Sequence, residues 1–125
     1  MEGKTTRKQK KGKYGEDRAC EFLERKGWRI LERNFRCKAG EIDIVALGEG
    51  HLCFVEVKYR SRMDYGMPRD AVGRAKQRRL IMVAMLYMKL HPWLRGDYSP
   101  RMDIVEVLEL GGEEYIRHTP GAFSV

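Results

Sequence analysis

The feature that most constrains the fold is a pair of apolar runs joined by a glycine-rich turn, GEIDIVALGEGHLCFVEVKYRS, over residues 40–61. Such runs, bounded by glycines, are typical of a β-hairpin in the middle of a sheet. Each run nevertheless carries charges: Glu41 and Asp43 in the first, Glu56 and Lys58 in the second. An unpaired buried charge costs several kcal/mol or is neutralised, so we expect these groups to have partners or a function.

A four-residue loop over residues 48–51 would set the register of this hairpin. Counting back from the loop places Asp43 opposite Glu56 and Glu41 opposite Lys58, with all four side chains on one face. Two facing carboxylates repel each other, and a divalent cation between them reverses the sign of that interaction. Carboxylate oxygens are the ligands that Mg²⁺ and Mn²⁺ prefer. The hairpin therefore predicts a metal site; the alternative is a salt-bridged hairpin in which Glu41 pairs with Lys58.

The rest of the chain predicts an α/β fold in one domain. The expected elements are a helix over residues 15–26, a strand over 28–35, the two hairpin strands, a helix over 70–90 with Asp70 as its N-cap, and strands over 101–110 and 114–117. This α-β-β-β-α-β-β order predicts a mixed central β-sheet flanked by helices. We expect the domain to cover residues 14–118, between a disordered basic arm (1–13) and a C-terminal tail (119–125).

Positive charge is concentrated in two blocks of the sequence. The chain carries a net charge of +7, while residues 1–13 alone carry +5 and residues 58–79 carry +6. Concentrated positive charge favours a polyanionic partner, nucleic acid first. For the first block, a solvated arm without a partner is an equal alternative. A protein-binding adaptor would leave the second block without a purpose.

Several classes of protein are disfavoured by the composition. Cys20, Cys37 and Cys53 form no CxxC pair and have no paired histidine spacing, so neither a disulfide framework nor a zinc site is indicated. The apolar-rich stretch over residues 80–90 is far shorter than the roughly 20 residues that span a bilayer. The basic N-terminal stretch lacks the apolar segment of a secretory signal. We therefore expect a cytoplasmic protein that does not bind membranes.

The arrangement of the charged hairpin residues resembles that of a known superfamily. Asp43 and the Glu56-x-Lys58 pair lie across two strands, after one helix and before a basic helix, which resembles the PD-(D/E)XK nucleases. Within that superfamily, the wider pattern is similar to the YraN-like family of small bacterial proteins. The matching segments are GE (15–16), NFR (34–36), GEIDIVA (40–46), FVEVKYR (54–60), AVGRAKQRRL (71–80) and RMDIVEV (101–107).

This resemblance implies a restriction-endonuclease-like fold, close to that of archaeal Holliday junction resolvases, and a metal-dependent endonuclease acting on branched or flapped DNA. The residues that match Asp43 and Glu56 hold Mg²⁺ or Mn²⁺ in the superfamily, and the one that matches Lys58 assists hydrolysis. An acid in the place of Glu16 often completes the site. Glu16 also falls on the apolar face of its helix, and Glu41 is a further candidate ligand. Resolvases are dimers, so the resemblance also suggests a homodimer.

Basic and polar residues around the site are candidates for nucleic-acid contacts: Arg36, Arg60, Arg62, Arg74, Lys76, Gln77, Arg78 and Arg79. Lys76 or Gln77 matches a position that supports substrate or bound water in the superfamily. Helical spacing also puts Lys76 on the inward side of its helix, although a surface lysine is an equal alternative. Such backbone contacts are independent of base sequence and sensitive to salt. The alternative function is a non-catalytic nucleic-acid-binding or assembly module on a nuclease-like scaffold.

Two further predictions concern residues outside this site. We expect Asp103 to be structural and to pair with Arg101 or another base. Met82, Met85 and Met88 are expected to fill the core rather than line a partner-binding groove.

Overall fold

The computed structural model describes residues 7–60 and 72–124 of the chain. Its elements are α1 (Arg7–Arg25), β1 (Arg29–Cys37), β2 (Gly40–Gly48), β3 (His51–Arg60), α2 (Arg74–Leu90), the 3₁₀ helix η2 (Pro92–Leu94), β4 (Ser99–Leu110) and β5 (Glu113–Phe123). The α/β class and the mixed sheet are thus confirmed. The order of elements is predicted in part, because η2 was not expected and several bounds differ.

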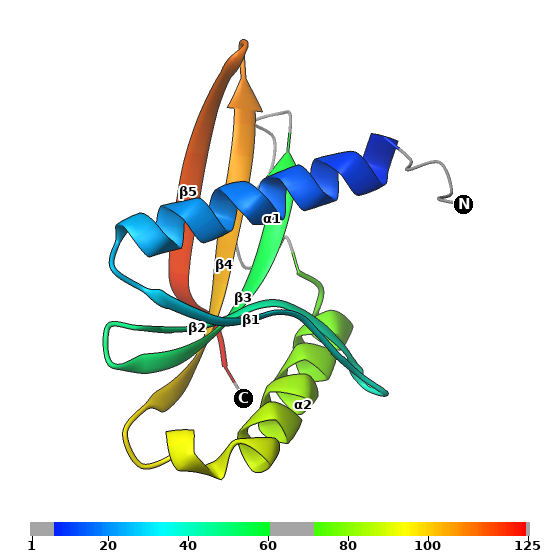
Figure 1. The fold of residues 1–125 in the computed structure, drawn as a ribbon. Coiled ribbons are helices and arrows are strands. Elements are labelled where there is room, and N and C mark those ends of the chain that lie inside the picture. Colours follow the sequence, from blue (N-terminus) through cyan, green and yellow to red (C-terminus); the bar gives the residue numbers. More distant parts are fainter. Residues whose placement is uncertain (1–6, 61–71, 125) are drawn as a thin grey trace, which may run out of the picture.

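The five strands form one sheet in the order β1-β2-β3-β4-β5 (Figure 1). The neighbours β3 and β4 are parallel, whereas the other three pairs are antiparallel. Parallel neighbours need a long crossover connection, and α2 supplies it here. Neither helix of the described residues is long and apolar enough to cross a membrane.

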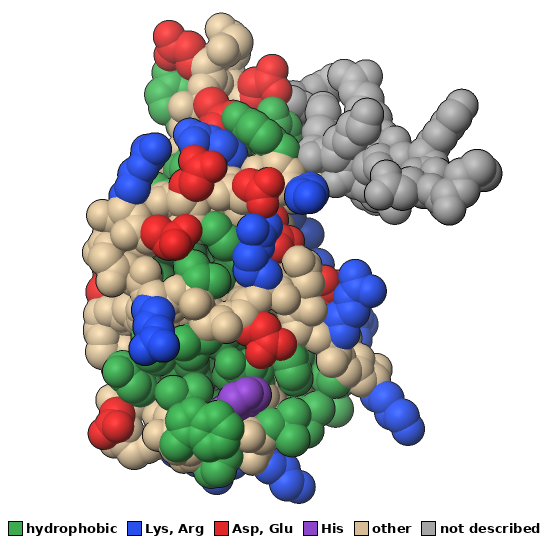
Figure 2. All heavy atoms as spheres, viewed as in Figure 1, with side chains coloured by type: hydrophobic (Ala, Val, Ile, Leu, Met, Phe, Trp, Pro, Cys, Tyr) green, Lys and Arg blue, Asp and Glu red, His purple; other side chains and the backbone are tan. Residues whose placement is uncertain are grey.

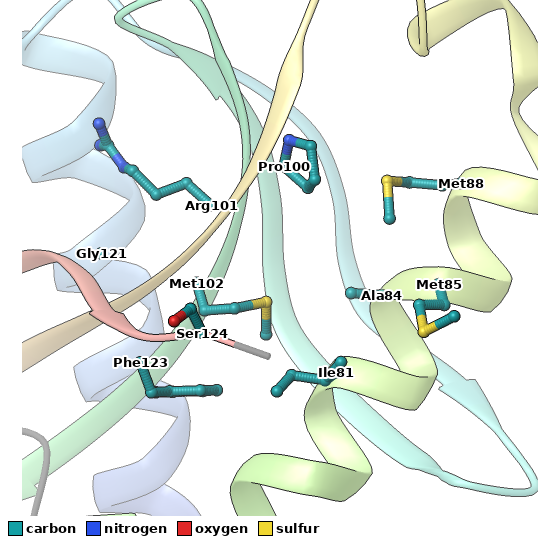
Figure 3. Close-up of a pocket in the computed structure, with 10 residues that line it drawn as sticks. All are labelled: Ile81, Ala84, Met85, Met88, Pro100, Arg101, Met102, Gly121, Phe123 and Ser124. Atoms are coloured by element: carbon teal, nitrogen blue, oxygen red, sulfur yellow. The ribbon is translucent and has the colours of Figure 1, made fainter.

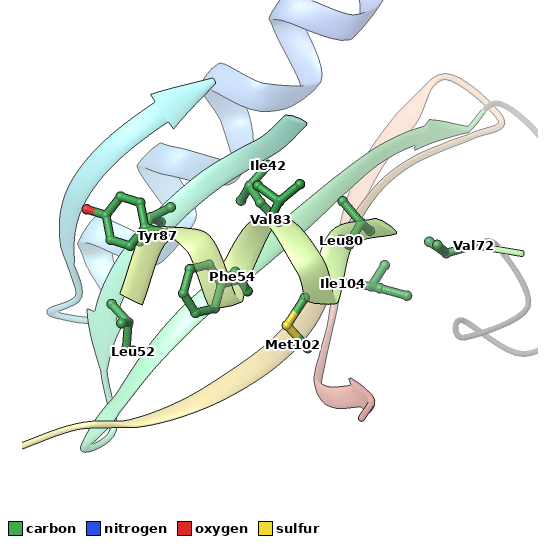
Figure 4. Close-up of a cluster of buried hydrophobic side chains, with 11 residues drawn as sticks. Ile42, Leu52, Phe54, Val72, Leu80, Val83, Tyr87, Met102 and Ile104 are labelled. Atoms are coloured by element: carbon green, nitrogen blue, oxygen red, sulfur yellow. The ribbon is translucent and has the colours of Figure 1, made fainter. Parts of the chain in front are cut away.

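The two helices cover opposite faces of the sheet. Because successive strand residues point to opposite faces, Val55 packs on the side of α1 and Phe54 on the side of α2. One cluster contains Ala19, Leu23, Ile44, Val55 and Val105; the other contains Phe54, Leu80, Val83, Tyr87 and Ile104 (Figure 4). Full burial of one such large side chain stabilises the fold by roughly 1.5–3 kcal/mol.

The hairpin between β2 and β3 has the predicted register and a shorter turn. Gly48 and His51 already form a backbone pair, so the turn consists of Glu49 and Gly50 alone. Both residues have positive φ (56° and 78°), as a two-residue type I′ turn requires. The predicted pairs Leu47–Leu52 and Val45–Phe54 are both present.

Helix α1 begins earlier than predicted. It starts at Arg7 rather than near Gly15, so residues 7–13, assigned to a disordered arm, belong to the helix. Residues 1–6 lie outside the described part of the chain. Gly15 suggested a helix start, but it permits a close approach instead: a Cβ there would lie 3.3 Å from Cβ of Tyr59 on β3.

The bounds of α2 and β5 also differ from the prediction. Helix α2 begins at Arg74 with Gly73 in the N-cap position, while the expected cap Asp70 lies outside the described residues. Strand β5 continues to Phe123, so the segment assigned to a tail joins the sheet, where Thr119 faces Ile104 and Phe123 faces Met102 of β4. Ala122 and Phe123 pack on the core cluster under α2, which explains why this short segment is ordered against β4.

Candidate active site

The two hairpin carboxylates lie together where the sheet divides. The β2–β3 pairing ends at Ile44–Val55, and extending its register by one residue brings Asp43 opposite Glu56. Past this point β2 continues along β1 and β3 continues along β4, but β2 and β3 no longer pair with each other. The two halves of the sheet therefore separate (Figure 1). Asp43 Oδ2 accepts a hydrogen bond from the backbone N–H of Val57 at 2.8 Å. The Asp43 and Glu56 side chains also hydrogen-bond to each other.

This environment favours a proton between the two carboxylates. Burial, followed by the negative charge of Glu56 and the hydrogen bond to it, raises the pKa of Asp43 to about 7. The N–H of Val57 and the positive charge of Lys76 act in the opposite direction. Asp43 therefore keeps its proton to a higher pH than an ordinary aspartate, which is fully ionised at neutral pH.

Two lysines flank the carboxylates. Lys76 Nζ lies 3.3 Å from Oε1 of Glu56, so Lys76 points inward from α2, as its helical spacing predicts. Lys58 follows Glu56 by two residues on β3 and therefore points to the same face. Burial and then the charge of Lys76 lower the pKa of Lys58 below its usual value, while Glu56 opposes this. A lysine with a lowered pKa gives up its proton more readily.

Glu16 lies on the inward side of α1 but has other partners. Its Oε1 atom accepts hydrogen bonds from Arg33 Nε and from Asn34 Nδ2, both at 2.9 Å. Asn34 has a left-handed backbone (φ 56°), a conformation that asparagine tolerates better than most residues. Sequence reasoning missed these two partners. Within residues 7–60 and 72–124, no group of three or more His, Cys, Asp or Glu side chains is arranged to hold a metal.

Glu41 also has a partner other than the predicted one. It faces Arg36 across the β1–β2 pair, and Arg36 Nε lies 3.3 Å from Glu41 Oε2. The alternative hairpin salt bridge between Glu41 and Lys58 was therefore wrong, because β2 and β3 have separated before they reach these residues. The side chain of Arg36 is 77% exposed and remains accessible to a ligand.

The other predicted nucleic-acid contacts fall into different settings. Arg74, Arg78 and Arg79 lie exposed on α2. Gln77 Nε2 donates to the carbonyl oxygen of Val72 at 2.8 Å. Arg62 lies outside the described residues.

Arg60 contributes to a buried charge cluster that the sequence did not reveal. Its Nε atom lies 3.4 Å from Oε2 of Glu106, which is fully buried on β4. Arg117 of β5 donates two further hydrogen bonds to Glu106, at 2.8 and 3.0 Å. The alternating apolar and charged residues of β4 predict which of its side chains share a face. They do not predict which strands supply the partners of Glu106.

Asp103 has the structural setting that was predicted. Arg101 donates two hydrogen bonds to its carboxylate, at 2.9 and 3.0 Å, as expected. His118 Nε2 lies 2.8 Å from Oδ2, and the backbone N–H of Gly121 donates at 3.0 Å. Burial opposes ionisation, but these hydrogen bonds outweigh it and lower the pKa of Asp103.

These features define a class of protein: a small α/β protein with a mixed five-stranded sheet, in which a carboxylate pair and two lysines meet where β2 and β3 separate. The chain belongs to the uncharacterised protein family UPF0102, whose model matches residues 15–107. This confirms the resemblance to the YraN-like family.

The similar relatives share most of their length with this chain. A UPF0102 protein of Syntrophotalea carbinolica is 44% identical over 114 residues, which cover 91% of each chain. A UPF0102 protein of Myxococcus xanthus is 43% identical over 112 residues, covering 90% of this chain and 87% of the relative. A third UPF0102 protein, from Caldanaerobacter subterraneus, is 41% identical over 104 residues, covering 83% of this chain and 84% of the relative.

Proposed function

We propose that the protein is a metal-dependent nuclease of restriction-endonuclease-like fold that hydrolyses phosphodiester bonds in DNA. The observation that carries this proposal is the Asp43–Glu56 pair, in which Glu56 is buried and Asp43 is half-buried. Burial and the charge of Glu56 raise the pKa of Asp43, so the pair has less positive charge near it than full ionisation of both carboxylates requires. A hard divalent cation with oxygen ligands supplies that charge, so the donor set fits Mg²⁺ or Mn²⁺.

Asp43 and Glu56 would hold the cation. When bound, such an ion polarises a phosphoryl oxygen and lowers the pKa of a coordinated water. Lys58, on the same face as Glu56, would hold a phosphate oxygen or orient the attacking water. Lys76 provides a second ammonium group beside Glu56. To bind the cation, Glu16 would have to break its hydrogen bonds with Arg33 and Asn34. We therefore assign the cation to Asp43 and Glu56.

The substrate class follows from the surface around the site. Arg74, Arg78 and Arg79 extend from the same helix as Lys76 and are exposed, so they can contact phosphates. Contacts of this kind bind the backbone without reading bases. We therefore propose selection of DNA by structure, at branches or flaps, by an enzyme that acts in the cytoplasm.

One contact favours a second candidate, a non-catalytic nucleic-acid-binding module. Lys76 forms an ion pair with Glu56 at 3.3 Å, so part of the buried negative charge has a partner within the protein. On this alternative the hairpin charges stabilise a binding scaffold and have no chemical role.

A cleavage assay distinguishes the two candidates. Labelled single-stranded, duplex, flapped and four-way-junction DNA would be incubated with the protein in Mg²⁺, Mn²⁺ or EDTA. We expect cutting that requires metal and falls at least about a hundredfold in Asp43→Ala and Glu56→Ala. Asp97→Asn, at an exposed acid after η2, is the matched control and keeps full activity. Tight DNA binding without cutting, unchanged in both site variants, would support the binding module instead.

A further inference from the structure

Helix α2 exposes apolar side chains to solvent. Met82, Met85 and Leu90 are 59%, 58% and 54% exposed, and Trp93, just beyond the helix, is 67% exposed. Of the seven exposed large hydrophobic residues in the described part of the chain, five lie between Met82 and Trp93. The prediction that Met82 and Met85 fill the core was therefore wrong. A contiguous exposed apolar surface of this kind marks an interaction site.

A groove runs beside this surface, between α2 and the end of β5. Figure 3 shows Met85 and Met88 of α2 facing Met102 of β4 and Phe123 of β5 across it. The cavity has a volume of about 190 Å³. It adjoins a second, more open hollow, which shares Ile81 and Ser124 with the first and is also lined by Arg74, Gln77, Arg78 and Met82.

The dimensions of the groove fit a helix. Residues 74–88 of α2 line its length, which corresponds to roughly 21 Å at a rise of 1.5 Å per residue. That length accommodates about four turns of a partner helix. Methionines line much of the groove, and their flexible side chains adapt to the apolar residues of a bound helix.

The charges around the groove indicate the sign of the partner. Helix α2 contains five basic residues, namely Arg74, Lys76, Arg78, Arg79 and Lys89, and no Asp or Glu. In Figure 2, hydrophobic side chains gather at the lower end of the molecule, with Lys and Arg side chains around them. A second copy of this face would bring like charges together, whereas an acidic partner is attracted.

We propose that this groove binds an acidic amphipathic helix of a partner protein. Its apolar side chains would lie between Met85, Met88 and Phe123, and its carboxylates would face Arg74 and Arg78. The concave shape favours a helix over a planar lipid surface, which would not enter the groove. The inference does not depend on nuclease activity, although the groove shares Arg74 and Arg78 with the proposed phosphate contacts.

The probe is a set of synthetic peptides of about 18 residues, with leucines on one helical face and glutamates on the other. The leucine positions are shifted between peptides, so that the set samples several registers. Binding to the full chain is measured by isothermal titration calorimetry. We expect saturable binding of at least one glutamate peptide, weakened by added salt, and at least about tenfold weaker binding of its lysine-substituted counterpart.

Substitutions then locate the binding site. Met85→Glu places a carboxylate in the groove and is expected to weaken peptide binding at least about tenfold, while Met85→Leu stays within about threefold of wild type. Tyr115→Glu changes an exposed aromatic residue on β5, outside the groove, and serves as the matched control. Because Met85 is exposed, each variant should keep the wild-type circular dichroism spectrum. DNA binding by Met85→Glu should be unchanged, which separates this test from that of the proposed nuclease.

Several results would overturn the proposal. These are no binding of any glutamate peptide, equal binding of the lysine peptides, or no effect of Met85→Glu. Sedimentation with vesicles of phosphatidylcholine and phosphatidylglycerol, in the absence of peptide binding, would identify a lipid surface instead. A wild-type dimer that Met85→Glu dissociates would show that the face is occupied by a second copy of this chain.

Discussion

Replacing Asp43 by asparagine should stabilise the fold at alkaline pH. Asparagine has nearly the same shape, can accept the hydrogen bond from Val57 N–H, and can donate its amide to Glu56. It therefore keeps the local hydrogen bonds and removes one of two facing negative charges. Sites that bind ligands often sacrifice stability in this way.

The magnitude follows from the shift in proton affinity. The folded state raises the pKa of Asp43 from 3.8 to about 7, and each tenfold change in proton affinity corresponds to about 1.4 kcal/mol. Because the folded pKa is raised, the unfolded chain binds fewer protons between these two values, and wild-type stability falls as the pH rises through this window. Relative to wild type, Asp43→Asn should gain little at pH 4, just above the unfolded pKa, and on the order of 4 kcal/mol at pH 8, above the folded one.

Urea unfolding at a series of pH values, in EDTA and followed by circular dichroism, measures this difference. Asp97→Asn, an exposed acid, is the control and should show no such trend. Mg²⁺ at ten times its dissociation constant should then stabilise wild type by about 1.4 kcal/mol at pH 8 and leave Asp43→Asn unchanged. A free-energy difference between Asp43→Asn and wild type that is negative, or that does not vary between pH 4 and pH 8, would refute the reasoning.

Three further outcomes follow from other contacts. Lys76→Ala removes the ammonium beside buried Glu56, so the free energy of unfolding at pH 8 should fall by about 1–3 kcal/mol in urea titrations without metal. Asp103→Asn breaks a buried ion pair and should cost about 3–5 kcal/mol at pH 7. Since the pKa of Asp103 is lowered, its stabilisation is lost as the pH falls from 3.8 toward the folded value, which an acid unfolding series detects. DNA binding should weaken steeply with salt, and Arg78→Ala and Arg79→Ala should each lower the slope of log K against log[salt] by about one phosphate contact; slopes equal to wild type would exclude them from the interface.

Local patterns were sufficient to predict the centre of the site. The turn chemistry of the hairpin and its alternating residues fix the register, and the register alone brings Asp43 to Glu56. Helical spacing likewise predicts that Lys76 points toward the sheet, where it contacts Glu56. These predictions succeeded because the distances involved are determined within one hairpin or one helix.

Long-range packing accounts for the features that sequence reasoning missed. The sequence around Gly15 predicts a helix boundary, because the sequence does not show that Tyr59 of β3 packs closely against this glycine. Glu16 lies on the predicted side of α1, but its carboxylate is taken by Arg33 and Asn34 from a different element. Met85 was assigned to the core by residue type, yet it lies two positions from both buried Val83 and Tyr87 and so points away from their stripe. Neither the close approach at Gly15 nor the partners of Glu16 follow from periodicity.

A comparison of the acidic residues inside the protein supports the proposal that the Asp43–Glu56 pair binds a cation. Asp103 receives four hydrogen bonds from basic side chains and a backbone N–H, and Glu106 receives two from Arg117 with Arg60 nearby. Within residues 7–60 and 72–124, the donors to the Asp43–Glu56 pair are the N–H of Val57 and the ammonium of Lys76. The two carboxylates thus share these two donors and the nearby charge of Lys58, whereas Asp103 alone receives four hydrogen bonds. Selection for stability alone would favour asparagine at position 43, so retention of both charges in one chain argues that the pair has a ligand.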